Sequence, residues 1–324
     1  MDLTFHEVLD RTAERRPDHP AIIGPDPIQA FTYDEFADRS RRLAASLADR
    51  GIAANERVVF QLPNSAEFLV AFMACSRIGA IPVMVLPRHR EAEVSHVVDL
   101  TDATAIITDA NRYDTGFDYI ELVDGIRDRY PHLDSCIAVT ADDEEAPPGW
   151  LEFSALSTAE ETVTEGPGVD PAEPGVMLLS GGTTGMPKGI PRTHNDYVFQ
   201  WKHMARVVGV EEDWIAFPSV PIGHNASLCC VVGAALWRGA TVAIEPRLKP
   251  DALMALIERF EGSFSLPIPT QIIDILEHPD LDQYDLSSLK VLISGGQKVP
   301  PHAVYESVER WDIGFCNIFG MAEG

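Results

Sequence analysis

A short run of small polar residues in the middle of the chain has the residue types of a phosphate-binding loop. Glycine lets the backbone turn tightly, so that successive N–H groups can point at one anion. Hydroxyl groups add further donors, and a lysine adds a mobile positive charge. The run consists of Ser180, Gly181, Gly182, Thr183, Thr184, Gly185, Met186, Pro187, Lys188 and Gly189. We expect it to bind phosphate, although a flexible surface turn is the common alternative for Gly and Ser clusters.

The neighbours of this loop favour the phosphate interpretation. The apolar run 176–179 predicts a short buried strand before it, and a helix is expected from about Asn195. A strand, a polar loop and a helix together form many phosphate sites, because helix N-termini attract anions. The sequence therefore predicts a strand–loop–helix cradle.

Three more polar clusters lie next to predicted strands. Residues 294–297 and 320–324 each follow a strand directly, and 223–225 lie between a strand ending near Pro218 and an apolar helix. Ligands of open parallel sheets bind beyond the carboxyl ends of the strands. We therefore expect the clusters and the glycine-rich loop to converge on one pocket.

The elements that must position these clusters alternate between strand and helix. This rhythm favours α/β architecture, with mainly parallel sheets covered by helices. The predicted strands are 57–62, 81–86, 104–108, 136–139, 176–179, 214–218, 240–245, 289–293 and 315–319. The predicted helices are 32–51, 64–77 with Asn64 and Glu67 as caps, 118–130, 196–208, 226–237, 251–260, 271–276 and 301–311.

A connector rich in Asp, Glu, Pro and Gly divides the chain. It begins near residue 141 and is interrupted only by an apolar stretch at 150–153. We interpret it as exposed and as the boundary between two units. The expected domains are a first α/β subdomain at 1–168 and a second at 169–324, which carries the polar clusters.

Composition excludes some classes of protein. The 324 residues are 45% hydrophobic, enough for a large core, and the formal net charge of -25 argues against a nucleic-acid partner. The sequence has no signal-like segment and no run of about 18 apolar residues, so we expect a cytoplasmic protein without a membrane partner. Its five cysteines lack CxxC spacing and are expected to be free thiols.

The glycine-rich loop and the end of the chain resemble the signature motifs of the adenylate-forming, or AMP-binding, enzyme superfamily. They are SGGTTGMPKG and the terminal NIFGMAEG. The longer string from Leu179 to Val198, with 221–225, is similar to the branch that adenylates 2,3-dihydroxybenzoate or salicylate for siderophores. The resemblance covers most of the chain. It implies two packed, mainly parallel α/β sheet subdomains of the family's N-terminal domain, truncated before its C-terminal domain.

The resemblance also implies a site for ATP and Mg²⁺. The glycine-rich loop would close over the β- and γ-phosphates, and Glu323 would be the ligand of Mg²⁺, a hard cation that suits a carboxylate. Asn317 would hydrogen-bond the adenine amino group, and Phe319 would stack on its ring. The implied ATP-binding residues are Ser180, Gly181, Gly182, Thr183, Thr184, Gly185, Lys188, Gly295, Gly296, Gln297, Asn317, Phe319 and Gly320, and the implied catalytic residues are Lys188, His224 and Glu323.

The pocket for the acid is implied at His224, Asn225 and Cys230. The Asn225 amide can donate to or accept from an ortho hydroxyl of an aryl ring. Two alternatives stay open: His224 as a polar loop residue, and Asn225 as a helix N-cap before Ala226. Ala226, Cys230 and Gln297 depart from the residues usual in the aryl-acid branch, so a differently shaped carboxylate is also compatible. His194 belongs to the matching string, and we expect a structural role for it.

The expected activity is the ATP-dependent adenylation of an aryl carboxylic acid to acyl-AMP and pyrophosphate. The full-length enzyme would then pass the acyl group to a carrier-protein thiol or to coenzyme A. The alternatives are a coenzyme A ligase for an aromatic or alicyclic acid, and a non-catalytic nucleotide-binding fragment. Family members continue beyond the terminal motif with a ribose-binding Asp and a mobile domain that carries a Lys. We therefore expect the 324 residues alone to be impaired in adenylation.

Overall fold

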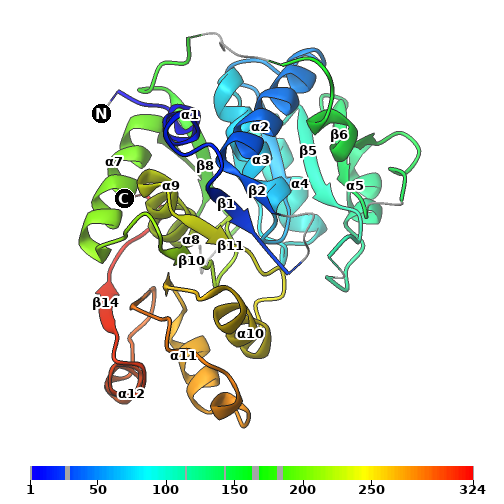
Figure 1. Ribbon diagram of the computed structural model, residues 1–324. Helices are drawn as coiled ribbons and strands as arrows, with labels where there is room; N and C mark the ends of the chain where they lie inside the picture. The colour runs from blue at the N-terminus through cyan, green and yellow to red at the C-terminus, as the bar shows by residue number, and fades with distance from the viewer. Residues whose placement is uncertain are drawn as a thin grey trace.

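Two seven-stranded sheets organise the computed structural model, which describes residues 2–25, 30–113, 115–141, 144–162, 168–180 and 185–323 (Figure 1). In order across the sheet, sheet A contains β14 (Gly314–Ile318), β13 (Val291–Gly295), β12 (Phe264–Ser265), β10 (Ile215–Ala216), β11 (Thr241–Ala243), β1 (Pro20–Ile23) and β2 (Phe31–Thr32). Sheet B contains β7 (Leu151–Glu152), β6 (Ser135–Val139), β5 (Ala105–Asp109), β3 (Arg57–Gln61), β4 (Ile81–Met84), β8 (Pro174–Leu179) and β9 (Gly189–Thr193). Among the strands of the described residues, only the β1–β2 and β8–β9 pairs are antiparallel, which confirms the mainly parallel α/β fold.

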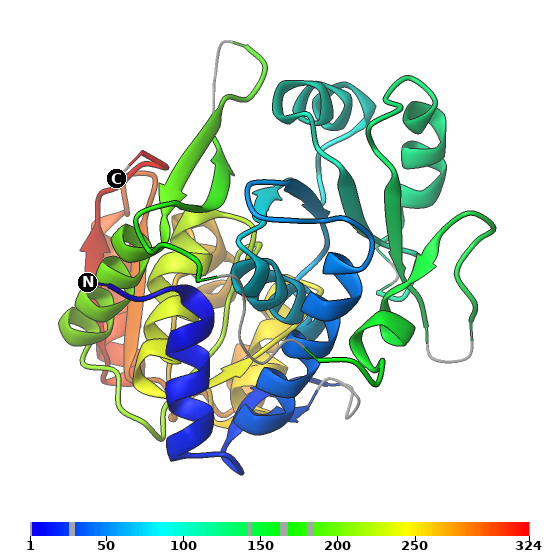
Figure 2. The same cartoon turned by 90° about the horizontal axis from the view of Figure 1, so that it is seen from above.

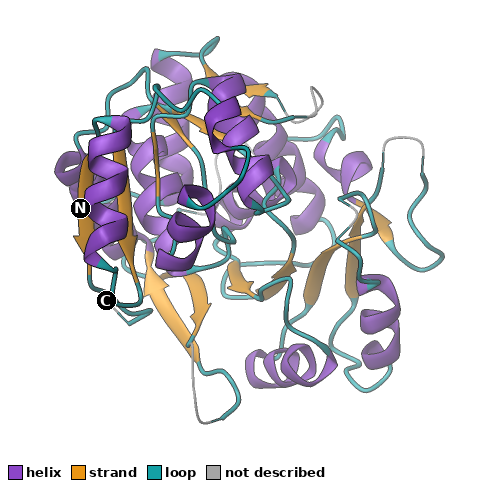
Figure 3. Cartoon of the chain, turned by 90° about the horizontal axis from the view of Figure 1, so that it is seen from below, coloured by secondary structure: helices purple, strands orange, loops and turns teal. Residues whose placement is uncertain are grey.

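Helices pack around and between these sheets (Figure 3). They are α1 (Phe5–Arg15), α2 (Tyr33–Ala48), α3 (Ala66–Ile78), α4 (Glu91–Thr101), α5 (Tyr119–Arg127), α6 (Phe153–Ser157), α7 (His194–Val208), α8 (Asn225–Ser227), α9 (Ala234–Arg238), α10 (Pro250–Phe260), α11 (Pro269–Leu276) and α12 (Pro301–Trp311). A π-helical segment, η2 (Leu228–Gly233), joins α8 to α9, and η3 (Leu281–Gln283) is a short 3₁₀ turn. None of the described helices is long and apolar enough to cross a membrane.

Local sequence signals account for several helix ends. Thr32 caps α2 in a capping box, accepting from the Glu35 N–H at 3.3 Å while the Glu35 carboxylate accepts from the Thr32 N–H at 2.8 Å. The cap of α3 is Ser65, not Asn64 as predicted, since the Ser65 hydroxyl accepts from the Phe68 N–H at 3.1 Å. These capping residues thus fix where α2 and α3 begin.

The sheets do not follow the division expected near residue 168. Strands β1 and β2 belong to sheet A, where Ile22 pairs with Val242, and β8 and β9 belong to sheet B, where Met177 pairs with Val83. The acidic connector indicated where the chain is exposed. It carried no information about which buried strands pair, because strand pairing depends on tertiary packing. Each sheet therefore includes strands from both sides of the connector.

One core cluster joins the two sheets. It contains residues of β3 and of β11, connected through Phe5 of α1, Phe72 of α3 and Trp201 of α7. The ring of Phe5 lies 4.9 Å from that of Phe72 and 5.0 Å from that of Trp201, centroid to centroid. Such close packing resists relative movement of the elements. The loops at the ends of the two sheets are therefore held on one common body.

Candidate active site

The glycine-rich loop connects the two strands of a hairpin. Ser180 follows β8, and its N–H donates to the Lys188 carbonyl at 3.0 Å. The Ser180 hydroxyl accepts from the Lys188 N–H, also at 3.0 Å. Both Gly185 and the Lys188 side chain are exposed to solvent. The predicted residues Gly181, Gly182, Thr183 and Thr184 lie outside the described residues.

The expected strand–loop–helix cradle is wrong, because β9 separates the loop from α7. The N-cap of α7 is Thr193, which pairs with Pro174 at the far end of β8. Five strand residues separate the loop from this helix start, a distance of about 16 Å. The N-terminus of α7 therefore cannot supply its dipole to the loop. Pro191 argues against a strand in the sequence, so β9 was not predicted. Proline is nevertheless compatible with an edge strand, and β9 is at the edge of sheet B.

The two motifs expected at the adenine lie side by side at the ends of β13 and β14. Gly295 pairs with Ile318, and a Cβ on Gly295 would lie 2.4 Å from the Ile318 carbonyl oxygen. Only glycine fits this close approach. Gly296 follows with φ of 76°, which turns the chain away from the strand. Because Gly295 has no side chain, the two motifs can lie this close to each other.

The residues beyond these strands are accessible to a ligand. Gln297, Asn317 and Gly320 are exposed, and the Phe319 side chain is 93% exposed. An aromatic ring in this position leaves its face free to stack on a flat ligand. The geometry is compatible with an adenine between the two motifs.

Asn225 lies in a hydrogen-bonded cluster rather than capping a helix. The cap of α8 is His224, whose Nδ1 accepts from the Ala226 N–H at 3.2 Å. The Tyr197 hydroxyl donates to Asn225 Oδ1 at 2.6 Å, and Asn225 Nδ2 donates to the Met321 carbonyl at 3.1 Å. The alternative that Asn225 is the N-cap is therefore wrong. Its amide connects the predicted acid pocket to the terminal motif.

The other two residues predicted for the acid lie close to Asn225 in the chain. Desolvation of the His224 ring and the nearby Arg88 guanidinium lower the pKa of His224, so the ring is neutral at pH 7. Since Nδ1 accepts a hydrogen bond, the proton of the neutral ring resides on Nε2. Cys230 is half-buried in η2, a type of helix that often occurs at functional sites.

Sequence reasoning missed the residue that holds the loop before His224. The Asn64 side chain is buried and donates to the carbonyls of Pro218 and Val220, both at 3.2 Å. Its Oδ1 accepts from the Ile222 N–H at 2.7 Å. These bonds use the amide that the sequence assigned to a cap of α3. The sequence around Asn64, an apolar strand followed by an apolar helix, does not indicate that its side chain hydrogen-bonds to residues 218–222.

Arg192 was also missed, and it contacts the segment that carries Glu323. Its Nη1 donates to the Ala322 carbonyl at 2.9 Å, and its Nε donates to Asp196 at 2.6 Å. The green β8–β9 hairpin and the red C-terminal segment lie side by side in Figure 2. The four-residue spacing of Arg192 and Asp196 was the only sequence signal for this arginine. It predicts a local ion pair and says nothing about the contact with Ala322.

Glu323 is exposed, as a shared metal ligand must be. Within the described part of the chain, no three His, Cys, Asp or Glu side chains form a group that could hold a metal alone. Mg²⁺ is commonly bound by one or two carboxylates together with substrate phosphates. Glu323 therefore fits Mg²⁺ shared with a nucleotide, and the described residues provide no closed protein cage for it.

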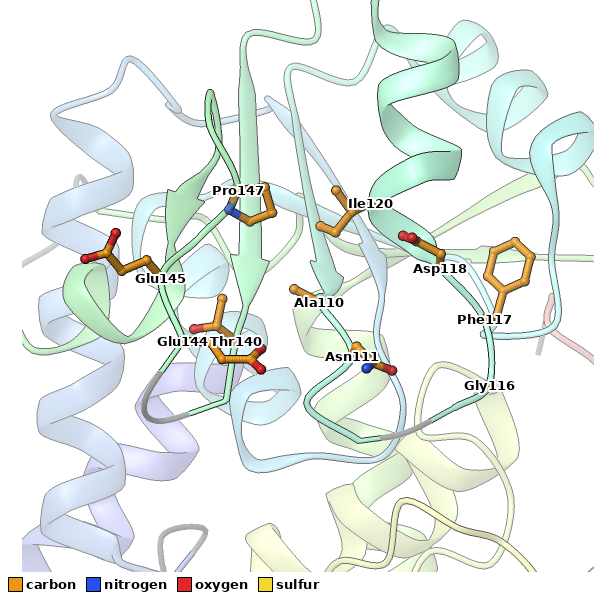
Figure 4. Close-up of a pocket in the computed structure, with 10 residues that line it drawn as sticks. All are labelled: Ala110, Asn111, Gly116, Phe117, Asp118, Ile120, Thr140, Glu144, Glu145 and Pro147. Carbon is orange, nitrogen blue, oxygen red and sulfur yellow. The ribbon is translucent and has the colours of Figure 1, made fainter.

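A separate cavity of about 450 Å³ lies beyond the ends of β5 and β6 (Figure 4). None of the predicted site residues lines it. The residues that do are Ala110, Asn111, Gly116, Phe117, Asp118, Ile120, Thr140, Glu144, Glu145 and Pro147.

Two known proteins align in sequence with nearly the whole of this chain. The salicyl-AMP ligase / salicyl-S-ArCP synthetase of Mycobacterium tuberculosis is 35% identical over 326 residues, which cover 99% of this chain and 56% of that protein. The 2,3-dihydroxybenzoate-AMP ligase of Bacillus subtilis is 33% identical over 324 residues, covering 99% of this chain and 58% of the relative. The chain thus spans little more than half the length of these relatives.

A solved structure and a family description agree with these relatives. The apo structure of Mycobacterium smegmatis MbtA superposes with a TM-score of 0.85 at 32% identity, covering 100% of this chain and 58% of that one. The family model described as "AMP-binding enzyme" matches residues 9–324 of this chain. Because this match covers nearly the whole chain and contains every motif described above, the chain belongs to the family of AMP-binding enzymes.

Proposed function

We propose that the full-length protein adenylates an aryl carboxylic acid with ATP, the acid being salicylate or 2,3-dihydroxybenzoate. The observation that carries this proposal is the hydrogen bond from Asn225 to the Met321 carbonyl. It joins the residues proposed for the acid to the motif proposed for the nucleotide. The similarity to two aryl-acid AMP ligases supports the same activity.

Asn225 has the hydrogen-bonding capacity that an ortho hydroxyl needs. A carboxamide carries two N–H donors and two acceptor lone pairs. The Met321 carbonyl uses one donor, and the Tyr197 hydroxyl uses one lone pair. One donor and one acceptor remain for a ligand. We propose that they bind the ortho hydroxyl, with the Nε2–H of His224 and the half-buried Cys230 completing the acid pocket.

The nucleotide is proposed to lie between the hairpin loop and the ends of β13 and β14. Lys188 would contact the phosphates, together with Ser180, Gly185 and the predicted loop residues 181–184. Phe319, Asn317 and residues 295–297 would contact the adenine. Glu323 would hold Mg²⁺ jointly with the phosphates, and bound Mg²⁺ would neutralise charge on the phosphate oxygens.

The proposed chemistry requires no covalent enzyme intermediate. A carboxylate oxygen of the acid attacks the α-phosphorus of ATP, an acyl–phosphate bond forms, and pyrophosphate leaves. The side chains position the two substrates and stabilise charge, which is the main source of rate in phosphoryl chemistry. The acyl group then passes from the adenylate to a thiol, either of an aryl carrier protein or of coenzyme A.

Acid-dependent exchange of pyrophosphate into ATP tests the proposal in the full-length protein. We expect exchange with salicylate and 2,3-dihydroxybenzoate, and weaker exchange with benzoate. Supplying a carrier protein or coenzyme A as acceptor then identifies the second substrate. If no aryl, alicyclic or aliphatic acid supports exchange although ATP binds, the protein is a non-catalytic nucleotide-binding member of the family and the proposal is wrong.

A further inference from the structure

We infer that Arg192 is a positioning residue that orients Glu323 by holding the carbonyl of the preceding residue. The inference rests on the proposed role of Glu323 as a ligand of Mg²⁺. It gives a role to the buried Arg192 guanidinium, which is far from Glu323 in the sequence. Arg192 itself is not placed in contact with substrate or metal.

The Arg192 side chain has the geometry of a fixed support. It is 5% exposed, and its Nε donates to Asp196 Oδ2 at 2.6 Å. The guanidinium carbon lies 5.4 Å from the centroid of the Tyr197 ring. With Nε and one face occupied, the Nη1 group is aimed at the Ala322 carbonyl, 2.9 Å away. A planar guanidinium can satisfy such separate partners at once, whereas an ammonium group acts as a point charge.

Side chains from distant parts of the sequence hold the segment that carries Glu323. The ladder between β13 and β14 ends at Ile318. Among the described residues, no backbone-to-backbone hydrogen bond involves 319–323. Instead two consecutive carbonyls accept from side chains: Met321 from Asn225, and Ala322 from Arg192. Since the Arg192 bond is adjacent to Glu323, its loss should affect this carboxylate most.

A purely structural role for Arg192 predicts something different. Loss of a buried ion pair would lower stability and total activity without changing the response to metal. A positioning role predicts that more Mg²⁺ is needed to reach half of the maximal rate. Removing an outer residue that orients a metal ligand typically costs about ten- to a hundredfold in metal affinity.

The experiment measures the Mg²⁺ concentration for half-maximal salicylate-dependent pyrophosphate exchange at saturating ATP, in the full-length protein. We expect roughly a tenfold increase for Arg192→Met and a smaller increase for Arg192→Lys. Arg206→Met, at an exposed arginine on the following helix α7, is the control and should leave the value unchanged. Thermal unfolding of each variant identifies any loss of fold, and repeating it with ATP over a range of Mg²⁺ concentrations gives the Mg²⁺ requirement for ligand stabilisation without turnover. Arg192→Lys keeps the test valid if Arg192→Met is unfolded.

Glu323→Gln separates failure of this inference from failure of the proposed function. If Glu323→Gln raises the Mg²⁺ requirement and both Arg192 variants leave it unchanged, the inference is overturned and the metal site stands. If Glu323→Gln has no effect, the metal assignment is wrong and the inference falls with it. The double variant should require no more Mg²⁺ than Glu323→Gln alone, because Arg192 acts through Glu323. Additive effects would contradict this.

Discussion

The hairpin loop at 180–188 and the terminal loop at 320–323 differ in how much of their support is local. The hairpin loop is closed by its own strands, through the reciprocal bonds between Ser180 and Lys188. The terminal loop is held by Arg192 and Asn225, which lie 130 and 96 residues away from their partners. The hairpin loop thus has closing bonds of its own beside one distant contact, between His96 Nε2 and the Pro187 carbonyl at 2.9 Å, whereas the bonds to the terminal loop come from distant side chains. Substitutions should affect the two loops accordingly.

The largest effect is expected in the hairpin loop, at Lys188. Its side chain is exposed and free to reach a phosphate. Loss of a charge-assisted contact of this kind costs about 1.5–3 kcal/mol. Lys188→Ala should therefore lower kcat/KM for ATP by roughly ten- to more than a hundredfold, with the unfolding midpoint unchanged. Unchanged pyrophosphate exchange in this variant would show that Lys188 does not bind the phosphates. The exposed Lys202 of α7, changed to Ala, serves as the matched control.

The next effect concerns the anchor of the terminal loop, Asn225. A buried amide partner left unsatisfied costs about 1–3 kcal/mol, or roughly five- to more than a hundredfold in kcat/KM. We expect the full-length protein to prefer salicylate to benzoate by such a factor, and Asn225→Ala to erase the preference. The ratio of kcat/KM for the two acids is the measurement, because it cancels any common loss caused by the broken bond to Met321.

Tyr197→Phe is the companion variant for Asn225. It removes the donor to Oδ1 but leaves the bond to Met321 intact. We expect a smaller change in the acid preference than Asn225→Ala produces. If the wild-type protein does not discriminate between the two acids, or if Asn225→Ala keeps the full preference, Asn225 only positions the terminal loop.

A pair of glycines compares the hairpin loop with the pairing of β13 and β14 that precedes the terminal loop, by their effects on stability. A Cβ at Gly295 would lie 2.4 Å from the Ile318 carbonyl oxygen, whereas a Cβ at Gly185 meets nothing within 4 Å. Gly295→Ala must therefore shift β13 against β14, and such overpacking costs about 1–3 kcal/mol. Gly185→Ala should leave the urea midpoint within error. Equal midpoints for the two variants would show that β14 adapts freely, against the close approach described here.

The smallest effect is a pH dependence at His194, the first residue of the helix that carries Tyr197. Burial, and to a lesser extent nearby His6, lower the pKa of His194 to about 3. The unfolded chain therefore binds a proton that the native chain does not as the pH falls below about 6.5, and native stability decreases. Between pH 7.5 and 6.0 this amounts to about 0.8 kcal/mol.

His194→Leu should remove this share of the acid destabilisation, as measured by urea unfolding at the two pH values. His302→Gln, on an exposed helical surface, should leave the pH dependence unchanged. The buried ring of His194 packs 4.3 Å from that of Phe5, in agreement with the structural role expected for it. A wild-type stability that is constant over this range would contradict a neutral buried ring.

The sequence was informative where function depends on a contiguous string. Strand and helix alternation predicted most elements, and the glycine-rich loop was found from its composition, although β9 was hidden by Pro191. The assignments of the individual ATP-, acid- and metal-binding residues remain predictions. The roles of Asn64 and Arg192 could not be predicted, because each depends on a partner brought close only by folding. Sheet membership had the same difficulty, since short strands such as β1 carry no information about their neighbour.

The pairing of β1 with β11 has a consequence for the growing chain on the ribosome. Ile22 finds its partner at Val242, some 220 residues later. At a synthesis rate of about 5–20 residues per second, the N-terminal strand waits on the order of 10–40 s for that partner to emerge. Until then β1 can pair only with β2, a strand of two residues, and lacks its parallel neighbour. We therefore expect the segment around β1 to be open to chaperone binding during synthesis, and slower translation to lengthen its exposure to aggregation.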